Sequence, residues 1–226
     1  MVSTGRLRDV AIDRFAAQGF QATGIRDIAE HAGISVATLY HHMRTKEELL
    51  EDIMSESLLR LTANADAVLK ELSAPADQVA GLTVLHVLTH GLEQNRTLVV
   101  DTELRSLGPD ARSRVVALRD DYELRWSRTL SSLKDSVQVA APNPGITRLS
   151  ILNMLTGVAT WYDRQGKTGL DDIARLHVDL VLAMLGATTR DGTAIRLRDC
   201  DLPDLQWFHE LIDQTEAGSG DRSTRS

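Results

Sequence analysis

Apolar residues recur at the three- and four-residue spacing of amphipathic helices along most of the chain. Leu7, Ala11 and Phe15 mark one face of the first helix, and Gly19 marks its end. Alternating Val- and Ile-rich runs bounded by hairpin dipeptides, which are typical of β-strands, are absent from the sequence. The pattern therefore predicts an all-α protein.

Three short helices are predicted before any long one. The second covers residues 25–32, and the third follows Gly33, has Ser35 as its N-cap and continues to about Tyr40. A glycine between two short helices is typical of a helix-turn-helix, because it can adopt the left-handed conformation that the tight turn often needs.

Longer helices follow. Thr45 and Glu48 have the spacing of a capping box, which predicts the start of a helix that continues to about Leu72. The next helices are expected over residues 75–92, 97–106, 109–133, 146–162 and 170–185. This gives about nine helices, and residues 205–212 are a possible additional one.

The helices divide the chain into three parts. Residues 1–46 are expected to form a three-helix helix-turn-helix domain, and residues 47–187 a larger helical domain. Residues 188–226 are interpreted as a partly disordered C-terminal extension, because the end after Ala217 is rich in Ser and Gly. Adjacent Trp207 and Phe208 indicate a docking contact, with the chain's own domain favoured over a partner.

Composition and charge are those of a globular protein. The 226 residues are 42% hydrophobic and 25% charged, and the single cysteine, Cys200, excludes an intrachain disulfide. No apolar run approaches the roughly 20 residues that span a bilayer, so we expect a cytoplasmic protein with no membrane partner. The net charge is −7, but residues 1–50 contain six basic and six acidic residues, so the acidity lies elsewhere.

The second helix of a helix-turn-helix enters the major groove of DNA. Its exposed side would present Ser35, Val36, Thr38 and His41. Hydroxyl groups bond phosphates or base edges, and small apolar groups contact thymine methyls. These residues therefore indicate double-stranded operator DNA as a partner.

The N-terminal stretch resembles the TetR family of regulators over nearly its whole length. The shared features are an Ala-x-x-x-Phe in the first helix, Thr23, Ile25, Asp27-Ile28-Ala29, Gly33-Ile34-Ser35, Thr38-Leu39-Tyr40, His42 and Lys46-Glu47-Glu48-Leu49-Leu50. Met43 stands where family members usually carry Phe, which is a conservative apolar departure.

The resemblance implies further DNA contacts. Tyr40 and Lys46 would hold phosphates, Thr23 would do so from the start of the second helix, and Arg26 would reach a base. Three alternatives stay open: a packing ring for Tyr40, a solvated charge for Lys46, and a bystander role for His41.

Two later stretches resemble a TetR subgroup that includes acyl-CoA-sensing repressors of sterol-ring and fatty-acid catabolism. The matching positions are Glu103-Leu-Arg105, Arg112, Leu118-Arg119, Tyr122, Trp126, Asn153, Gly157, Trp161-Tyr162 and Leu170-Asp171. The turn at residues 163–167 departs from the subgroup, whose members tend to carry Pro and a basic residue there. The resemblance implies that residues 47–187 bind a small-molecule effector and dimerise, without a cofactor.

A CoA thioester needs an apolar cavity for its acyl group and cations for its phosphates. The candidate ligand-binding residues are Arg105, Arg119, Tyr122, Trp126, Asn153 and Trp161. The arginines could instead form ion pairs, among them a pair of Glu103 with Arg105 or Arg119, and the tryptophans could be plain core. His86 and His90 have the spacing of two metal ligands, but no third ligand is evident, so no metal site is expected.

The last two strong helices predict a homodimer, because in relatives they pair with their two-fold copies as a four-helix bundle. The expected interface residues are Leu155, Gly157, Leu176, Leu180 and Met184. Two identical reading heads would match a palindromic operator.

The resulting hypothesis is a TetR-type repressor that an acyl-CoA thioester releases from DNA. One alternative is the same repressor responding to an antibiotic or another hydrophobic, drug-like ligand, and another is an activator or a structural DNA organiser. An enzyme is not expected, because no nucleophile–base set, glycine-rich phosphate loop or metal triad is visible.

Overall fold

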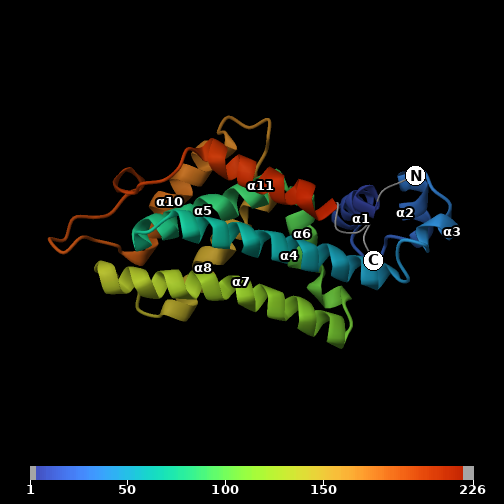
Figure 1. Ribbon diagram of the computed structural model, residues 1–226, viewed down its shortest axis with the longest axis horizontal. Coiled ribbons are helices and arrows are strands. Elements are labelled where there is room, and N and C mark those ends of the chain that lie inside the picture. The colour runs from blue at the N-terminus through green and yellow to red at the C-terminus, as the bar shows by residue number, and fades with distance from the viewer. Residues whose placement is uncertain (1–3, 221–226) are drawn as a thin grey trace. The chain divides into compact units, whose positions relative to one another are not determined.

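The computed structural model describes residues 4–220, which are mostly helical (Figure 1). The helices are α1 (Thr4–Gln18), α2 (Ile25–Ala32), α3 (Val36–Leu39), α4 (Lys46–Glu71), α5 (Pro75–Leu92), α6 (Gln94–Thr102), α7 (Pro109–Ser136), α8 (Pro144–Thr156), α9 (Val158–Trp161), α10 (Leu170–Leu185) and α11 (Leu205–Gly220), with short 3-10 helices η1 (Glu103–Ser106) and η2 (Leu197–Asp199). Isolated β-bridges join Thr188 to Gln138 and Ala194, and residues 4–220 contain no named strand. The all-α prediction is confirmed.

Two elements differ from the expected helices. The helix expected over residues 146–162 is divided at Gly157 into α8 and α9, because glycine is a weak helix former. The possible C-terminal helix is present as α11 and continues to Gly220, so part of the end expected to be disordered is helical. Residues 221–226 of that end lie outside the described residues.

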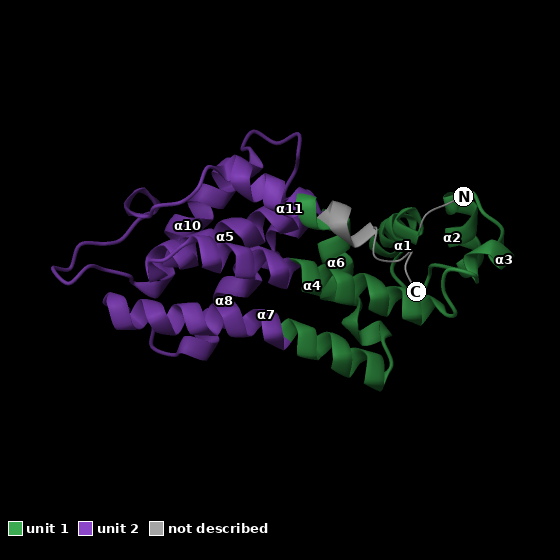
Figure 2. Ribbon diagram, in the orientation of Figure 1, with its two compact units in different colours: residues 1–60, 94–119, 214–226 green, residues 61–93, 120–213 purple. Residues whose placement is uncertain are grey.

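The chain forms two compact units (Figure 2). Among the described residues, unit 1 contains residues 4–60, 94–119 and 214–220, and unit 2 contains residues 61–93 and 120–213. The division passes through α4, α7 and α11, so each of these helices supplies residues to both units. Unit 1 does not end at residue 46, where the domain boundary was expected, and it includes α6 because α6 packs against α1.

The core of unit 1 fixes the three short helices. The predicted apolar face of α1 is buried, with Leu7 and Ala11 at 0% exposure and Phe15 at 1%. Met43 is also buried, at 5%, so it fills the position where relatives carry Phe. Gly33 has φ +68°, the left-handed conformation expected for the turn between α2 and α3.

The start of α4 follows the predicted capping pattern with one change. The Thr45 hydroxyl accepts a hydrogen bond from the Glu48 N–H at 3.0 Å. The Glu48 carboxylate reaches back to the N–H of Arg44, at 2.9 Å, rather than to that of Thr45. Two N–H groups at this helix start are therefore satisfied by side chains.

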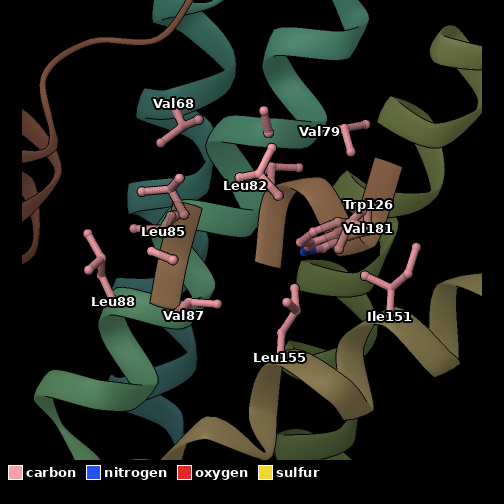
Figure 3. Close-up of a cluster of buried hydrophobic side chains, with 14 of the residues drawn as sticks. Val68, Val79, Leu82, Leu85, Val87, Leu88, Trp126, Ile151, Leu155 and Val181 are labelled. Carbon is pink, nitrogen blue, oxygen red and sulfur yellow. The ribbon is translucent and has the colours of Figure 1, made fainter. Parts of the chain in front are cut away.

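In unit 2, α5 is buried on nearly all sides and packs mainly against α10. Gly91 permits this approach, since a Cβ there would lie 2.3 Å from Leu170 Cδ1. Figure 3 shows Ile151 and Leu155 of α8 beside Trp126 in the same core. Phe208 of α11 is fully buried in that core, which confirms that this segment docks on its own chain.

Candidate functional site

The helix-turn-helix presents a polar surface on α2, α3 and the turn that follows. The exposed side chains are Arg26, Ser35, Thr38, Tyr40 and His41, and Val36 is half-buried. The Ser35 hydroxyl caps α3 by accepting a hydrogen bond from the Thr38 N–H at 3.0 Å. Tyr40 is 52% exposed, so its ring and hydroxyl are accessible to a phosphate.

Thr23 and Lys46, both expected to hold phosphates, have internal partners. Thr23 is 1% exposed, and its hydroxyl donates to the Gly19 carbonyl at 2.9 Å. The Lys46 ammonium donates to the Phe20 and Thr23 carbonyls, both at 2.7 Å. The expectation for Thr23 is therefore corrected, because its buried hydroxyl is bonded within the loop; the phosphate contact of Lys46 stays a prediction.

Unit 2 contains a buried polar cluster between α5, α7 and α8. His86 Nδ1 lies 2.8 Å from the Tyr122 hydroxyl, and His86 Nε2 lies 3.1 Å from the Thr156 hydroxyl. The Trp126 Nε1–H donates to the Tyr122 oxygen at 3.0 Å. His90 stacks on His86 with ring centroids 4.0 Å apart, and its Nδ1–H donates to the His86 carbonyl.

Burial keeps this cluster neutral. It lowers the pKa of His90 to about 4 and that of His86 well below its ordinary value, and the neighbouring His90 adds to the second shift. Burial also raises the pKa of the Tyr122 hydroxyl. Neutral donors and acceptors inside an apolar core are suited to recognise a carbonyl or hydroxyl group.

Sequence reasoning considered these histidines only as metal ligands. In the described part of the chain, no group of three or more His, Cys, Asp or Glu side chains is arranged to hold a metal ion. The signal that could have identified the cluster is the presence of His86 and His90 in an otherwise apolar helix, where a buried polar side chain needs a partner.

The predicted ligand residues of unit 2 lie in different environments. Tyr122 and Trp126 meet in the core of unit 2. Asn153 is exposed and donates to the Leu149 carbonyl, whereas Trp161 is 54% exposed and stacks on His177. The two remaining candidates, the arginines at 105 and 119, belong to unit 1.

Two further arginines of α7, Arg114 and Arg125, form ion pairs with acidic side chains of α4. Arg114 contacts both carboxylate oxygens of Glu51, at 2.6 and 3.0 Å. Arg125 contacts Asp66 in the same bidentate way, at 2.9 and 3.0 Å. These contacts favour a structural role for the two arginines.

Glu103 and Arg119, whose pairing was one alternative, make other contacts. Arg119 lies 3.7 Å from Asp101 and donates to the Val100 carbonyl. Glu103 accepts hydrogen bonds from the Phe20 N–H and the Ser106 hydroxyl. Glu103 makes these contacts because η1 places it beside the loop that follows α1.

Asp101 should make unit 1 sensitive to pH. Burial raises the pKa of its carboxyl to about 6, and Arg119 only partly offsets this. Because the folded pKa exceeds the unfolded one, stability is lost as the pH rises from about 4 through 6. Asp101→Asn is expected to stabilise unit 1 by about 1–2 kcal/mol at pH 8, after discounting for partial exposure.

The stability difference between Asp101→Asn and the wild type should vanish below about pH 4, where the Asp101 carboxyl is protonated in both the folded and the unfolded protein. Hydrogen exchange of peptides from residues 94–119, followed by mass spectrometry at the two pH values, measures it. Equal protection of wild type and variant at pH 8 would contradict the assignment.

Exposed apolar side chains gather on α8, α9 and α10. They are Ile146, Leu149, Trp161, Leu176, Leu180 and Met184, with exposures between 41% and 63%. Leu155, expected in the dimer interface, is 0% exposed and packs within unit 2, so we remove it from the candidate interface. Gly157 is half-buried beside this surface.

Within residues 4–220, no helix is both long enough and apolar enough to cross a membrane. An exposed helix-turn-helix in one helical unit, together with a second helical unit, is the architecture of a DNA-binding regulator.

Comparison with known proteins identifies the family. A family profile described as "Bacterial regulatory proteins, tetR family" matches residues 7–53, and one described as "Tetracyclin repressor-like, C-terminal domain" matches residues 72–185. The second match covers just over half of the chain, so the protein belongs to the TetR family. These are regulators, in agreement with the expectation that the chain is not an enzyme.

Two similar curated proteins carry the same name. The HTH-type transcriptional repressor KstR2 of Mycolicibacterium smegmatis is 36% identical over 76 residues, which are 34% of this chain and 37% of that protein. KstR2 of Rhodococcus jostii is 25% identical over 179 residues, 78% of this chain and 87% of that protein. The alignments with the mycobacterial relatives span about two fifths of their length.

Two solved structures share the fold. The ketosteroid transcriptional regulator KstR2 of Mycobacterium tuberculosis has a TM-score of 0.75 at 21% identity, covering 84% of this chain and 100% of that one. AibR in complex with isovaleryl coenzyme A and operator DNA has a TM-score of 0.69 at 19% identity, covering 77% and 97%.

Proposed function

We propose that this protein is a cytoplasmic transcriptional repressor that binds a palindromic operator as a homodimer and is released by an acyl-CoA thioester. The observation that carries the DNA-binding part is the exposed polar surface of α2 and α3. Arg26, Thr38 and Tyr40 are the side chains assigned to bases and phosphates, because their polar atoms face solvent on a helix-turn-helix.

The apolar surface of α8, α9 and α10 supports a homodimer. Leu176 and Leu180 are 57% and 52% exposed, although leucine is usually buried in a monomer. Exposed apolar side chains on helices that pack together are typical of a protein interface, and a two-fold axis would bury them against their own copies. The dimer would place two reading helices for the two half-sites of a palindrome.

The effector proposal rests on the neutral polar cluster of unit 2. His86, Tyr122 and Thr156 would offer hydrogen bonds to an acyl carbonyl in an otherwise apolar core. A protein of the same fold that was crystallised with isovaleryl coenzyme A and operator DNA supports a thioester as the first ligand to test. A hydrophobic drug-like ligand is the second candidate, because such a ligand would use the same neutral polar groups and their apolar surroundings.

Release requires that the effector prefer the state that does not bind DNA. A preference of about 2 kcal/mol would lower operator affinity roughly thirtyfold. Helices α4 and α7 each continue from one unit into the other, so a shift of either helix in unit 2 would reach unit 1.

The first experiment is native mass spectrometry of the purified protein after incubation with a mixed acyl-CoA panel. A retained mass that matches a CoA thioester is expected, and adding that thioester should then release the protein from operator DNA. The matched free acid is the control for recognition of the CoA part. An apo protein across the panel that still binds operator DNA would overturn the thioester and leave the repressor.

A further inference from the structure

The buried polar cluster of unit 2 contains a chain of four side chains joined by three hydrogen bonds. Trp126 Nε1 lies 3.0 Å from the Tyr122 oxygen, which lies 2.8 Å from His86 Nδ1. On the other side of the imidazole, His86 Nε2 lies 3.1 Å from Thr156 Oγ1. Within residues 4–220, the polar atoms of these four side chains make no other hydrogen bond, so the hydrogens of the chain can be counted.

The four side chains carry one more hydrogen than they can use among themselves. Because burial lowers the pKa of His86, its ring is neutral and has one N–H and one bare nitrogen. Tyr122 and Thr156 each have one O–H, and Trp126 has one N–H, which gives four hydrogens for three contacts. One hydroxyl hydrogen is therefore left over, whichever nitrogen of His86 carries the proton.

Burial decides which hydroxyl keeps this hydrogen. If His86 Nδ1 carried the proton, the hydrogen left over would be that of Tyr122, which is 3% exposed and lies in the core. If Nε2 carries it, the hydrogen left over is that of Thr156, which is half-buried. An unmade hydrogen bond is most costly in an apolar interior, which favours the Nε2–H form. The hydrogen bonds then run in one direction, from Trp126 to the Thr156 hydroxyl.

A second buried hydroxyl lies on the same side of α5 as His86. Thr89 follows His86 by three residues, a spacing that places two side chains on one side of a helix. Thr89 is 8% exposed, and its Oγ1 has no hydrogen-bond partner in the described part of the chain. By contrast, the hydroxyl of Thr83 on α5 donates to the Val79 carbonyl at 2.8 Å. Buried polar groups normally have partners, so Thr89 indicates a polar group that residues 4–220 do not supply.

We propose that the Thr156 hydroxyl is the donor that recognises the acyl carbonyl of the effector, and that His86, Tyr122 and Trp126 are positioning residues that direct its hydrogen. This inference rests on the proposed effector and deepens it, because it assigns the contact to one donor and one ligand atom. A carbonyl oxygen accepts a hydrogen bond and brings no hydrogen of its own, which matches the single hydrogen left over. A ligand group that only donates would leave that hydrogen unpaired.

The experiment compares acyl-CoA thioesters with S-alkyl-CoA thioethers of the same carbon chain, in which CH2 replaces the carbonyl. Isovaleryl-CoA and 3-methylbutyl-CoA are one such pair, and a panel of acyl chains supplies the others. Isothermal titration calorimetry on the full-length protein measures both dissociation constants. For the thioester that binds most tightly, the wild type is expected to prefer it over its thioether about tenfold, a difference of about 1.4 kcal/mol.

Three variants separate recognition from structure. Thr156→Val removes the hydroxyl but keeps the shape, so it should weaken the thioester about tenfold and leave the thioether unchanged. Thr156→Ser keeps a hydroxyl and should retain the preference for the thioester. Thr83→Val is the matched control, because the hydroxyl that it removes already donates to a backbone carbonyl, and it should also keep the preference. A purely structural role of Thr156 would weaken both ligands equally.

Nitrogen-15 NMR of the ligand-free protein, labelled at histidine, tests the direction of the hydrogen bonds. His86 should have a bare Nδ1 and a protonated Nε2, and its signals are identified as those that shift in Thr156→Val. A protonated Nδ1 would place the remaining hydrogen on Tyr122 and would overturn the assignment to Thr156.

The outcomes distinguish this inference from the proposed effector. Equal affinity of the wild type for thioester and thioether would overturn the inference, and so would an unchanged preference in Thr156→Val. In both cases a thioester still binds, so the inference alone fails. If no thioester of the panel binds to the folded wild type, the proposed effector fails and the inference fails with it.

Discussion

If the protein forms the proposed dimer, replacing Leu176 and Leu180 together with glutamate is expected to convert it into a monomer. Both side chains are more than half exposed on α10. A two-fold interface would bury one copy of each from either subunit, four leucines in all. Fully burying a leucine contributes about 1.5–3 kcal/mol, and these side chains are already about half buried, so removing four of them costs the dimer about 3–6 kcal/mol. Four carboxylates buried in their place add a desolvation penalty. Operator affinity should fall at least about hundredfold, because a monomer engages one half-site instead of two.

Sedimentation velocity measures the association state, and fluorescence anisotropy on an operator duplex measures the affinity. Leu59→Glu and Leu124→Glu are matched controls, because these leucines are 55% and 40% exposed on α4 and α7, outside the α8–α10 surface. Both controls should remain dimeric. A double variant that stays dimeric, or a control that dissociates, would place the interface elsewhere.

Local sequence chemistry accounts for most of the helix boundaries. Gly33 takes the left-handed turn, Pro75 and Pro144 occupy first turns, and Gly186 ends α10 with φ +58°. Each of these residues acts on its own few neighbours, so the sequence alone is enough to place it. The helix-turn-helix was predictable for the same reason, since its turn and small core lie within one short stretch.

The candidate sites depend on contacts between distant residues, and these were less predictable. Leu155 and Leu176 are both apolar residues at helical spacing, but only packing decides that the first is 0% exposed and the second 57%. Lys46 matched the family pattern for a phosphate ligand, yet its ammonium binds a loop 23 and 26 residues earlier. Periodicity identifies an apolar face without saying which neighbour covers it.

The polar cluster of unit 2 shows the same limit. His86 meets Tyr122 from 36 residues away and Thr156 from 70 residues away. The histidine spacing alone was compatible with a metal site or with simple packing. The hydrogen bonds, together with burial, favour a neutral network instead.

That network should make unit 2 lose stability in mild acid. The folded pKa of His90 is about 4, against about 6.5 in the unfolded chain. A lowered histidine pKa means that the unfolded chain binds more protons below pH 6.5, so stability falls as the pH falls from 6.5 toward 4. Between pH 7.5 and 4.5 His90 alone should remove about 2–3 kcal/mol, and His86 acts in the same direction.

His90→Leu is expected to reduce this acid loss by about 2–3 kcal/mol, because leucine binds no proton in the unfolded chain. Urea unfolding followed by tryptophan fluorescence is the measurement, since Trp126, Trp161 and Trp207 all lie in unit 2 and report on it alone. The control is His209→Gln on α11, whose ring lies near the surface, 2.8 Å from Asp171, and it should keep the wild-type acid loss. If His90→Leu and the wild type lose the same unfolding free energy between pH 7.5 and 4.5, the buried ring accepts its proton without unfolding the protein. That result would contradict a neutral network between α5, α7 and α8.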